Sequence, residues 1–156
     1  MKEAMLEIND DEKEILQSEI ELLSINSNGS GKAGIEFNKL LAAVNEKLID
    51  ETQLPVFSHI LELLLTTGDI RKNYGPVEEQ KIFRLYGKTP AGREQKESID
   101  ELNKSLKALE TQSIEGISFS LKLPGVYGIS IKTDKCELSL SVNKFGIYAD
   151  KFEIEI

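Results

Sequence analysis

Lys81, Arg84 and Lys88 have the types and spacing of a binding surface. They recur at intervals of three and four, which places them on one face of a helix. They lie in segment 69–96, which has seven basic and four acidic side chains in a chain of net charge −8. One interpretation is a helix-turn-helix-like contact with nucleic-acid phosphates. The other is a solvated basic face that pairs with the protein's own acidic helices.

The sequence NGSGK at residues 28–32 partly matches the phosphate-binding pattern G-x-x-x-x-G-K-[ST]. Asn26 takes the place of the first glycine, and Ala33 that of the hydroxyl residue that would hold magnesium. Both positions have a chemical role in phosphate binding, and neither Asn26 nor Ala33 can fill it. We therefore predict a flexible loop between two helices here, with no bound nucleotide or other cofactor.

His59 and Cys136 are the only histidine and the only cysteine of the chain. A metal site built on two histidines and an intrachain disulfide are therefore excluded. His59 lies on the most apolar predicted helix and is expected to be packed with one hydrogen-bond partner. Cys136 is in phase with apolar strand residues, which predicts a buried, inert thiol. We predict no catalytic, cofactor-binding or metal site.

The period of the apolar pattern changes near Ser113, from helical spacing to alternation. This predicts an α+β fold within a single domain over residues 1–156. Its mainly helical part, residues 9–112, has about five helices, over 10–24, 35–48, 55–67, 76–86 and a stretch containing Ile99, Leu102, Leu106 and Leu109. An antiparallel β-meander of three to five strands follows in residues 113–156, with strands at about 115–123, 126–133, 136–142 and 145–156.

The apolar strand residues are expected to pack against the helix over 55–67, and the fifth helix is expected to lie on the sheet. The strand set is Ile117, Phe119, Leu121, Ile129, Ile131, Leu138 and Leu140, and the helix set is Val56, Phe57, Ile60, Leu63 and Leu64. Truncating Phe119 to alanine would then cost about 3–5 kcal/mol. The opposite sheet face is rich in serine, which fits either a solvated surface or a docking surface.

The last strand changes phase at Asp150 and Lys151, which predicts a bulge or a break. Its apolar residues Phe152, Ile154 and Ile156 are expected to form a protein-interaction edge. That edge either pairs with another chain or is covered by a short strand over residues 4–8.

Composition and charge narrow the functional class. The first residues lack the pattern of a secretory signal, and no apolar run reaches the ~20 residues of a membrane span. We therefore expect a small, acidic, cytoplasmic protein that is not an enzyme and that binds a protein partner or its own copies, as an adaptor, regulatory or accessory protein. A nucleic-acid-binding regulator that uses segment 69–96 is the alternative. An enzyme with an unrecognised carboxylate site is the third interpretation.

Overall fold

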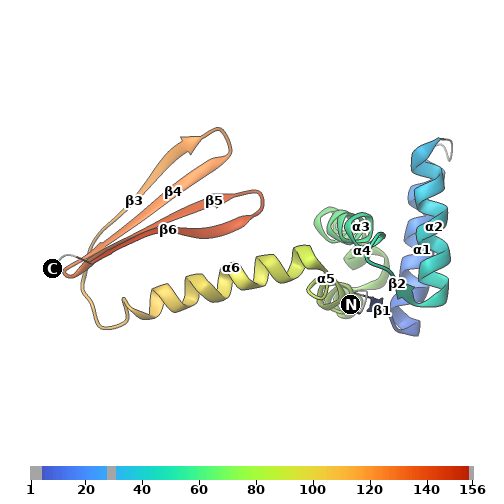
Figure 1. Ribbon diagram of the computed structural model, residues 1–156, viewed down its shortest axis with the longest axis horizontal. Coiled ribbons are helices and arrows are strands. Elements are labelled where there is room, and N and C mark those ends of the chain that lie inside the picture. Colours follow the sequence, from blue (N-terminus) through green and yellow to red (C-terminus); the bar gives the residue numbers. More distant parts are fainter. Residues whose placement is uncertain (1–4, 28–30, 155–156) are drawn as a thin grey trace. The chain divides into compact units, whose positions relative to one another are not determined.

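The computed structural model describes residues 5–27 and 31–154, and the side chains up to residue 150. Within this range it has six helices followed by a four-stranded antiparallel sheet, and a separate two-stranded sheet (Figure 1), which confirms the α+β prediction. The helices are α1 (Asp10–Asn26), α2 (Lys32–Glu46), α3 (Leu54–Thr67), α4 (Asp69–Tyr74), α5 (Pro76–Tyr86) and α6 (Pro90–Lys107). The strands are β1 (Leu6–Glu7), β2 (Leu48–Ile49), β3 (Ile114–Leu123), β4 (Val126–Thr133), β5 (Cys136–Asn143) and β6 (Gly146–Ile154).

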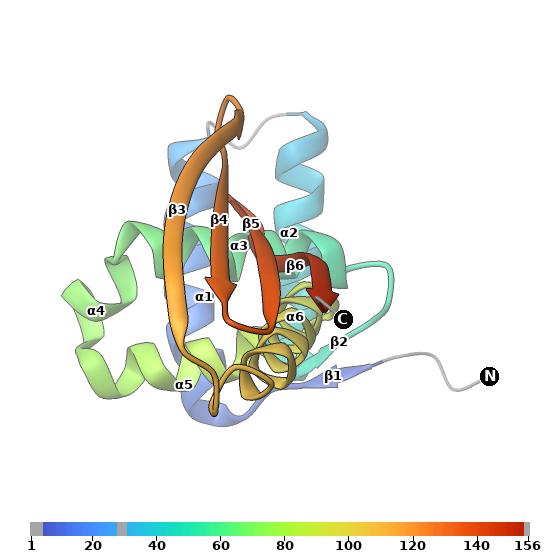
Figure 2. The same ribbon diagram turned by 90° about the vertical axis from the view of Figure 1, so that its left-hand side faces the viewer.

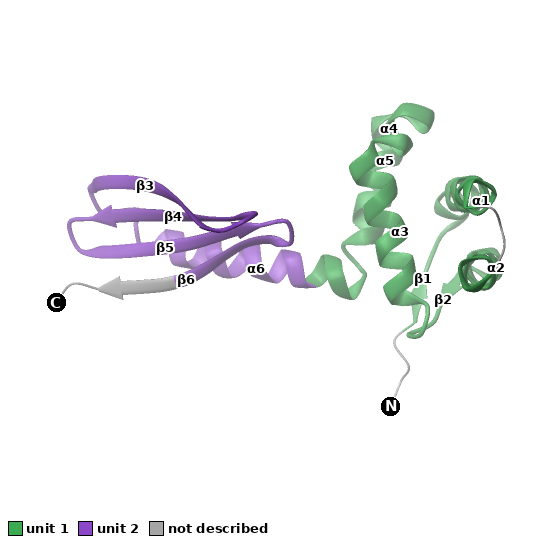
Figure 3. Cartoon of the chain, turned by 90° about the horizontal axis from the view of Figure 1, so that it is seen from above, with its two compact units in different colours: residues 1–93 green, residues 94–156 purple. Residues whose placement is uncertain are grey.

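The chain divides into two compact units, residues 1–93 and residues 94–156 (Figure 3). Unit 1 contains β1, β2 and the helices α1 to α5. Unit 2 contains most of α6 and the four-stranded sheet. The division therefore lies inside α6, whereas the sequence pattern divides the chain near Ser113. The expectation of a single domain stays a prediction.

Local signals of the sequence account for the helix boundaries of unit 1. The Glu12 amide donates to Asn9 Oδ1 at 2.8 Å, and the Asn9 amide donates to Glu12 Oε2 at 2.9 Å, a capping box at the start of α1. Gly68 and Gly75 have φ of +78° and +97°, a region that favours glycine. These glycines enclose the six residues of α4, a helix that was not among those predicted, which leave a gap between residues 67 and 76.

The N-terminal strand pairs inside unit 1. Leu6 lies opposite Ile49 and Glu7 opposite Leu48, so β1 and β2 form their own antiparallel sheet. The expectation that the strand over residues 4–8 covers β6 is therefore wrong. The partner of β1 is the short strand β2, which follows the left-handed residue Lys47 at the end of α2.

Helix α3 lies at the centre of the unit 1 core. Phe57, Leu61 and Leu64 are each at most 1% exposed. The core residues around them come from the same unit and include Leu16, Ile20, Leu40, Val44, Ile49, Ile70, Ile82 and Leu85. The apolar face of α3 is therefore filled by the neighbouring helices.

The predicted packing of the sheet on α3 is wrong at its central residue. Phe119 is 76% exposed, and its neighbours Ile117 and Leu121 are 54% and 66% exposed. Of the α3 side chains expected to receive them, Phe57, Ile60 and Leu64 are already buried in the unit 1 core, whereas Val56 is half-buried and Leu63 is exposed. The expected cost of about 3–5 kcal/mol for Phe119→Ala, which applies to a buried ring, therefore does not apply here.

A tight corner links α5 to α6. Thr89, immediately before α6, donates its hydroxyl to the Tyr86 carbonyl at 2.6 Å and accepts the Gly92 amide at 3.2 Å. A Cβ atom on Gly92 would lie 2.1 Å from the Tyr86 carbonyl oxygen and 2.8 Å from Cα of Gly87. Only glycine fits at residue 92 without moving the backbone of the corner.

We expect Gly92→Ala to lower the free energy of unfolding by about 1–3 kcal/mol, because the contact with the Tyr86 carbonyl outweighs the better helix propensity of alanine. Denaturant titration of the full chain measures this change. Gly116→Ala is the matched control, since a Cβ there meets nothing within 4 Å. Equal stability of the two variants would contradict the prediction.

Candidate functional site

The sheet of unit 2 has one apolar face. Its strands follow the order β3-β4-β5-β6, and each is antiparallel to the next. Phe119 lies opposite Ile129, and Ile129 lies opposite Leu140. Residues directly opposite each other project to the same side of a sheet, so one apolar face extends from β3 to β5. The alternation in the sequence predicted this face.

Helix α6 covers only part of that face. Leu102 is 7% exposed and packs with the buried Leu138 and Leu140, so the prediction that this helix lies on the sheet is confirmed. The partly buried residues around this contact are Leu106, Leu109, Ile129 and Ile147. Figure 2 shows α6 beneath β5 and β6, with β3 at the opposite edge.

The part of the face beyond α6 is bare. Ile117, Phe119 and Leu121 of β3 and Tyr127 of β4, here called the β3 apolar strip, are 54%, 76%, 66% and 56% exposed. Tyr127 lies opposite Leu121, which makes the four side chains one continuous patch. Contiguous apolar patches of this kind mark interaction sites on protein surfaces.

The core of unit 2 is small for its length. Among its described residues, the buried apolar side chains are Leu102, Cys136, Leu138 and Leu140. A domain of about 60 residues is marginally stable even with a full core. Covering the β3 apolar strip would therefore add a large fraction of the apolar burial that this unit lacks.

Both outer strands of the sheet carry bulges. On β3, the pairing with β4 shifts at Glu115 and at Lys122, which leaves Gly116–Leu121 in regular register between them. On β6, Lys151 pairs with Ser139 and Ala149 with Leu140, so Asp150 is the extra residue. The predicted irregularity at Asp150 and Lys151 is confirmed.

The predicted interaction edge lies on β6. Phe152 pairs with Leu138 and Ile154 with Cys136, which places both on the outer strand, while Ile156 lies outside the described residues. Their role in binding stays a prediction. The β3 apolar strip was not predicted, although the sheet face has more apolar residues in the sequence than one helix can cover, and that excess was the available signal.

Lys122 connects β3 to β5 and β6 on the serine-rich face of the sheet. Its ammonium group donates to Ser141 Oγ at 3.0 Å and forms an ion pair with Asp150, which also accepts the Ser141 hydroxyl. The side chain has room to cross β4 because residue 128 is glycine, where a Cβ would lie 2.9 Å from Lys122 Cε. The hydrogen bonds from Lys122 and Ser141 lower the pKa of Asp150.

The three basic residues of segment 69–96 have different surroundings. Lys81 Nζ lies 3.1 Å from carboxylate oxygens of both Asp11 and Glu78, and these partners raise the pKa of Lys81. Arg84 and Lys88 are exposed. Lys81 is therefore paired with acidic side chains of the protein itself, as the second interpretation of the basic segment predicts. Nucleic-acid contact through Arg84 and Lys88 stays a prediction.

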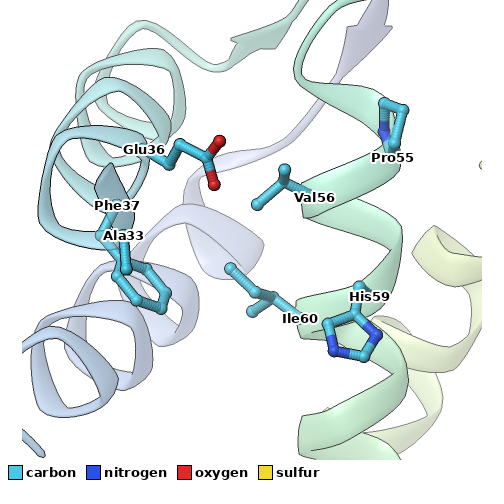
Figure 4. A pocket seen from close by; sticks show the side chains of 7 residues that line it. All are labelled: Ala33, Glu36, Phe37, Pro55, Val56, His59 and Ile60. Atoms are coloured by element: carbon cyan, nitrogen blue, oxygen red, sulfur yellow. The ribbon is translucent and has the colours of Figure 1, made fainter. Parts of the chain in front are cut away.

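A groove of about 380 Å³ lies between α2 and α3 (Figure 4). It is lined by Ala33, Glu36, Phe37, Pro55, Val56, His59 and Ile60. His59 is exposed here, so the prediction of a packed histidine is wrong. Phe57, Ile60 and Leu61 point into the core, and residue 59 faces the other side of the same helix. The lining is mainly apolar, so the groove could accommodate an apolar group.

The buried chemical groups already have structural partners. The thiol of Cys136 is 2% exposed and lies 3.3 Å from Thr133 Oγ1 and 3.1 Å from Gln112 Oε1, which confirms the prediction of a buried cysteine. Glu19, 4% exposed, accepts the Asn73 amide at 3.3 Å. Burial and the hydrogen bond with Glu19 raise the pKa of Tyr74.

The described residues were also searched for metal-binding clusters and for membrane-spanning helices. Within it, no group of three or more histidine, cysteine and acidic side chains is placed to hold a metal ion. Among the helices of the same residues, none is both long and apolar enough for a membrane crossing. Comparisons with protein-family models, curated proteins and solved structures found no significant match to this chain.

We expect the stability of the sheet to fall in acid partly through Asp150. Its pKa in the folded protein is lowered, so its ionised form stabilises the fold, and this contribution is lost as the pH falls below about 5 and through the folded pKa. Asp150→Asn should be less stable than the wild type at pH 7 and should lose less stability between pH 5 and acid. Unfolding titrations at several pH values measure both effects.

Asp100→Asn is the control, because Asp100 is exposed on α6 and has no ion pair among the described residues. A pH profile of Asp150→Asn that coincides with those of the wild type and of this control would contradict the role given to Asp150.

Proposed function

We propose that this protein acts by binding a protein partner through the β3 apolar strip. The observation that carries the proposal is the exposure of Phe119, 76%, at the centre of a continuous apolar face. A side chain of this size contributes most when it is fully desolvated by a complementary surface. The function is then that of an adaptor, regulatory or accessory protein.

The chemistry of the strip favours a protein over a nucleic acid. Ile117, Phe119, Leu121 and Tyr127 have no charge, and aromatic and aliphatic side chains are typical of the fully buried centre of protein interfaces. Nucleic-acid surfaces are bound through cations that neutralise phosphates. The net charge of −8 opposes such binding everywhere except in segment 69–96.

The alternative functions have weaker support. Of the three cations proposed for nucleic-acid contact, Lys81 is shared between two carboxylates, which leaves Arg84 and Lys88. An enzyme with a carboxylate site would need an acidic group available for proton transfer. The buried carboxylates Glu12 and Glu19 are used in the cap of α1 and in the contact with Asn73.

Site-specific photo-crosslinking tests the proposal in cells that naturally produce the protein. With benzophenone at residue 119, we expect a discrete light-dependent adduct, because the partner must cover this position. Phe83, 63% exposed on α5, is the matched control position for a phenylalanine outside the strip. Denaturing gels and mass spectrometry identify the adducts. Absence of an adduct at residue 119, or equal adducts from both positions, would overturn the proposal.

A further inference from the structure

We infer that the partner covering the β3 apolar strip is a second copy of this chain, packed face to face with the first. This inference rests on the proposed function, since it names the occupant of the same surface. It follows from three properties of unit 2, namely the neutrality of the strip, the position of α6 beside it, and the open edge of β3.

The strip is chemically complementary to itself. Its four side chains are uncharged, so two copies brought together there bury no charge, although each chain is acidic as a whole. The nearest cation on β3, Lys122, is engaged on the opposite face by Ser141 and Asp150. Two-fold dimers use one patch twice, and such a patch must match its own chemistry.

The position of α6 gives the strip the shape of a step. The helix covers the β5 side of the apolar face through Leu102 and leaves the β3 side open. A helix is about 10 Å thick, and two packed sheets also lie about 10 Å apart. The sheet of a second copy placed on the strip therefore lies at the height of α6 and beside it.

Two-fold symmetry then brings α6 of the second copy close to a second exposed feature without pairing with it. In this offset arrangement, α6 of the second copy lies level with the first sheet, beside the outer edge of β3. That edge is open because β3 ends the strand order, with regular pairing to β4 over Gly116–Leu121. Pairing of two β3 edges would instead hydrogen-bond the edges and leave both strips in water. Face-to-face packing is the arrangement that removes the apolar surface.

The available area fits a dissociable dimer. The four side chains of the strip expose roughly 500 Å² in each copy, so a pair buries roughly 1,000 Å², the lower limit for a specific interface. We therefore expect association that depends on concentration over roughly 1–200 μM, since interfaces of this size give modest affinity unless they are highly preorganised.

Sedimentation equilibrium of the full chain tests the inference. We expect the apparent mass to rise from 17.5 kDa towards twice that value with increasing concentration. Phe119→Ser should remain at 17.5 kDa with an unchanged circular dichroism spectrum, because the ring is exposed in a single copy. Phe83→Ser should associate like the wild type. A wild type that stays monomeric, or a Phe119→Ser variant that still associates, would overturn the inference.

Amide exchange by NMR separates face packing from edge pairing. Face packing leaves the β3 amides that point away from β4 without a backbone acceptor, so we expect them to exchange quickly in the dimer. Between Gly116 and Leu121, protection of the amides that point away from β4 as well as of those bonded to β4 would indicate edge pairing and overturn the face-to-face arrangement.

The outcome for the proposed function is separate. A monomeric wild type that still forms an adduct from residue 119 with a different protein would overturn the second copy as the occupant and support the proposed function. An adduct of twice the chain mass from residue 119 supports both. Absence of any adduct from that position would overturn both.

Discussion

The contact of Leu102 with Leu138 and Leu140 is the interaction on which unit 2 depends. It is the only place where the described side chains of this unit form a buried apolar cluster that joins the helix to the sheet. Because the cluster lies on the β5 side, it buries one part of the apolar face and leaves the other part uncovered. The same placement that stabilises the unit therefore also creates its candidate binding surface.

The fold was predictable from the sequence where the signal was local. Asn9 and Glu12 form the capping box that marks the start of α1. The alternation after Ser113 predicts the meander, and its change of phase predicts the bulge at Asp150. The helix α4 was missed because two glycines so close together also fit a loop, and six residues are too few to show a helical period.

The candidate site was less predictable because it depends on contacts between distant residues. Alternation shows that Phe119 and Leu138 share a face, but it does not show which of them α6 covers. The same limit explains His59, whose apolar neighbours along the chain suggested burial. The helix turns residue 59 away from the core that Phe57 and Ile60 enter.

The Lys122 crossing gives the sheet a property that binding surfaces need. Lys122 leaves β3, passes over Gly128 of β4, and reaches Ser141 of β5 and Asp150 of β6, so one side chain links three of the four strands on the face opposite the strip. Such a cross-brace limits twisting and sliding of the strands in the free protein. A partner then meets a surface that is already ordered, and less conformational entropy is lost on association.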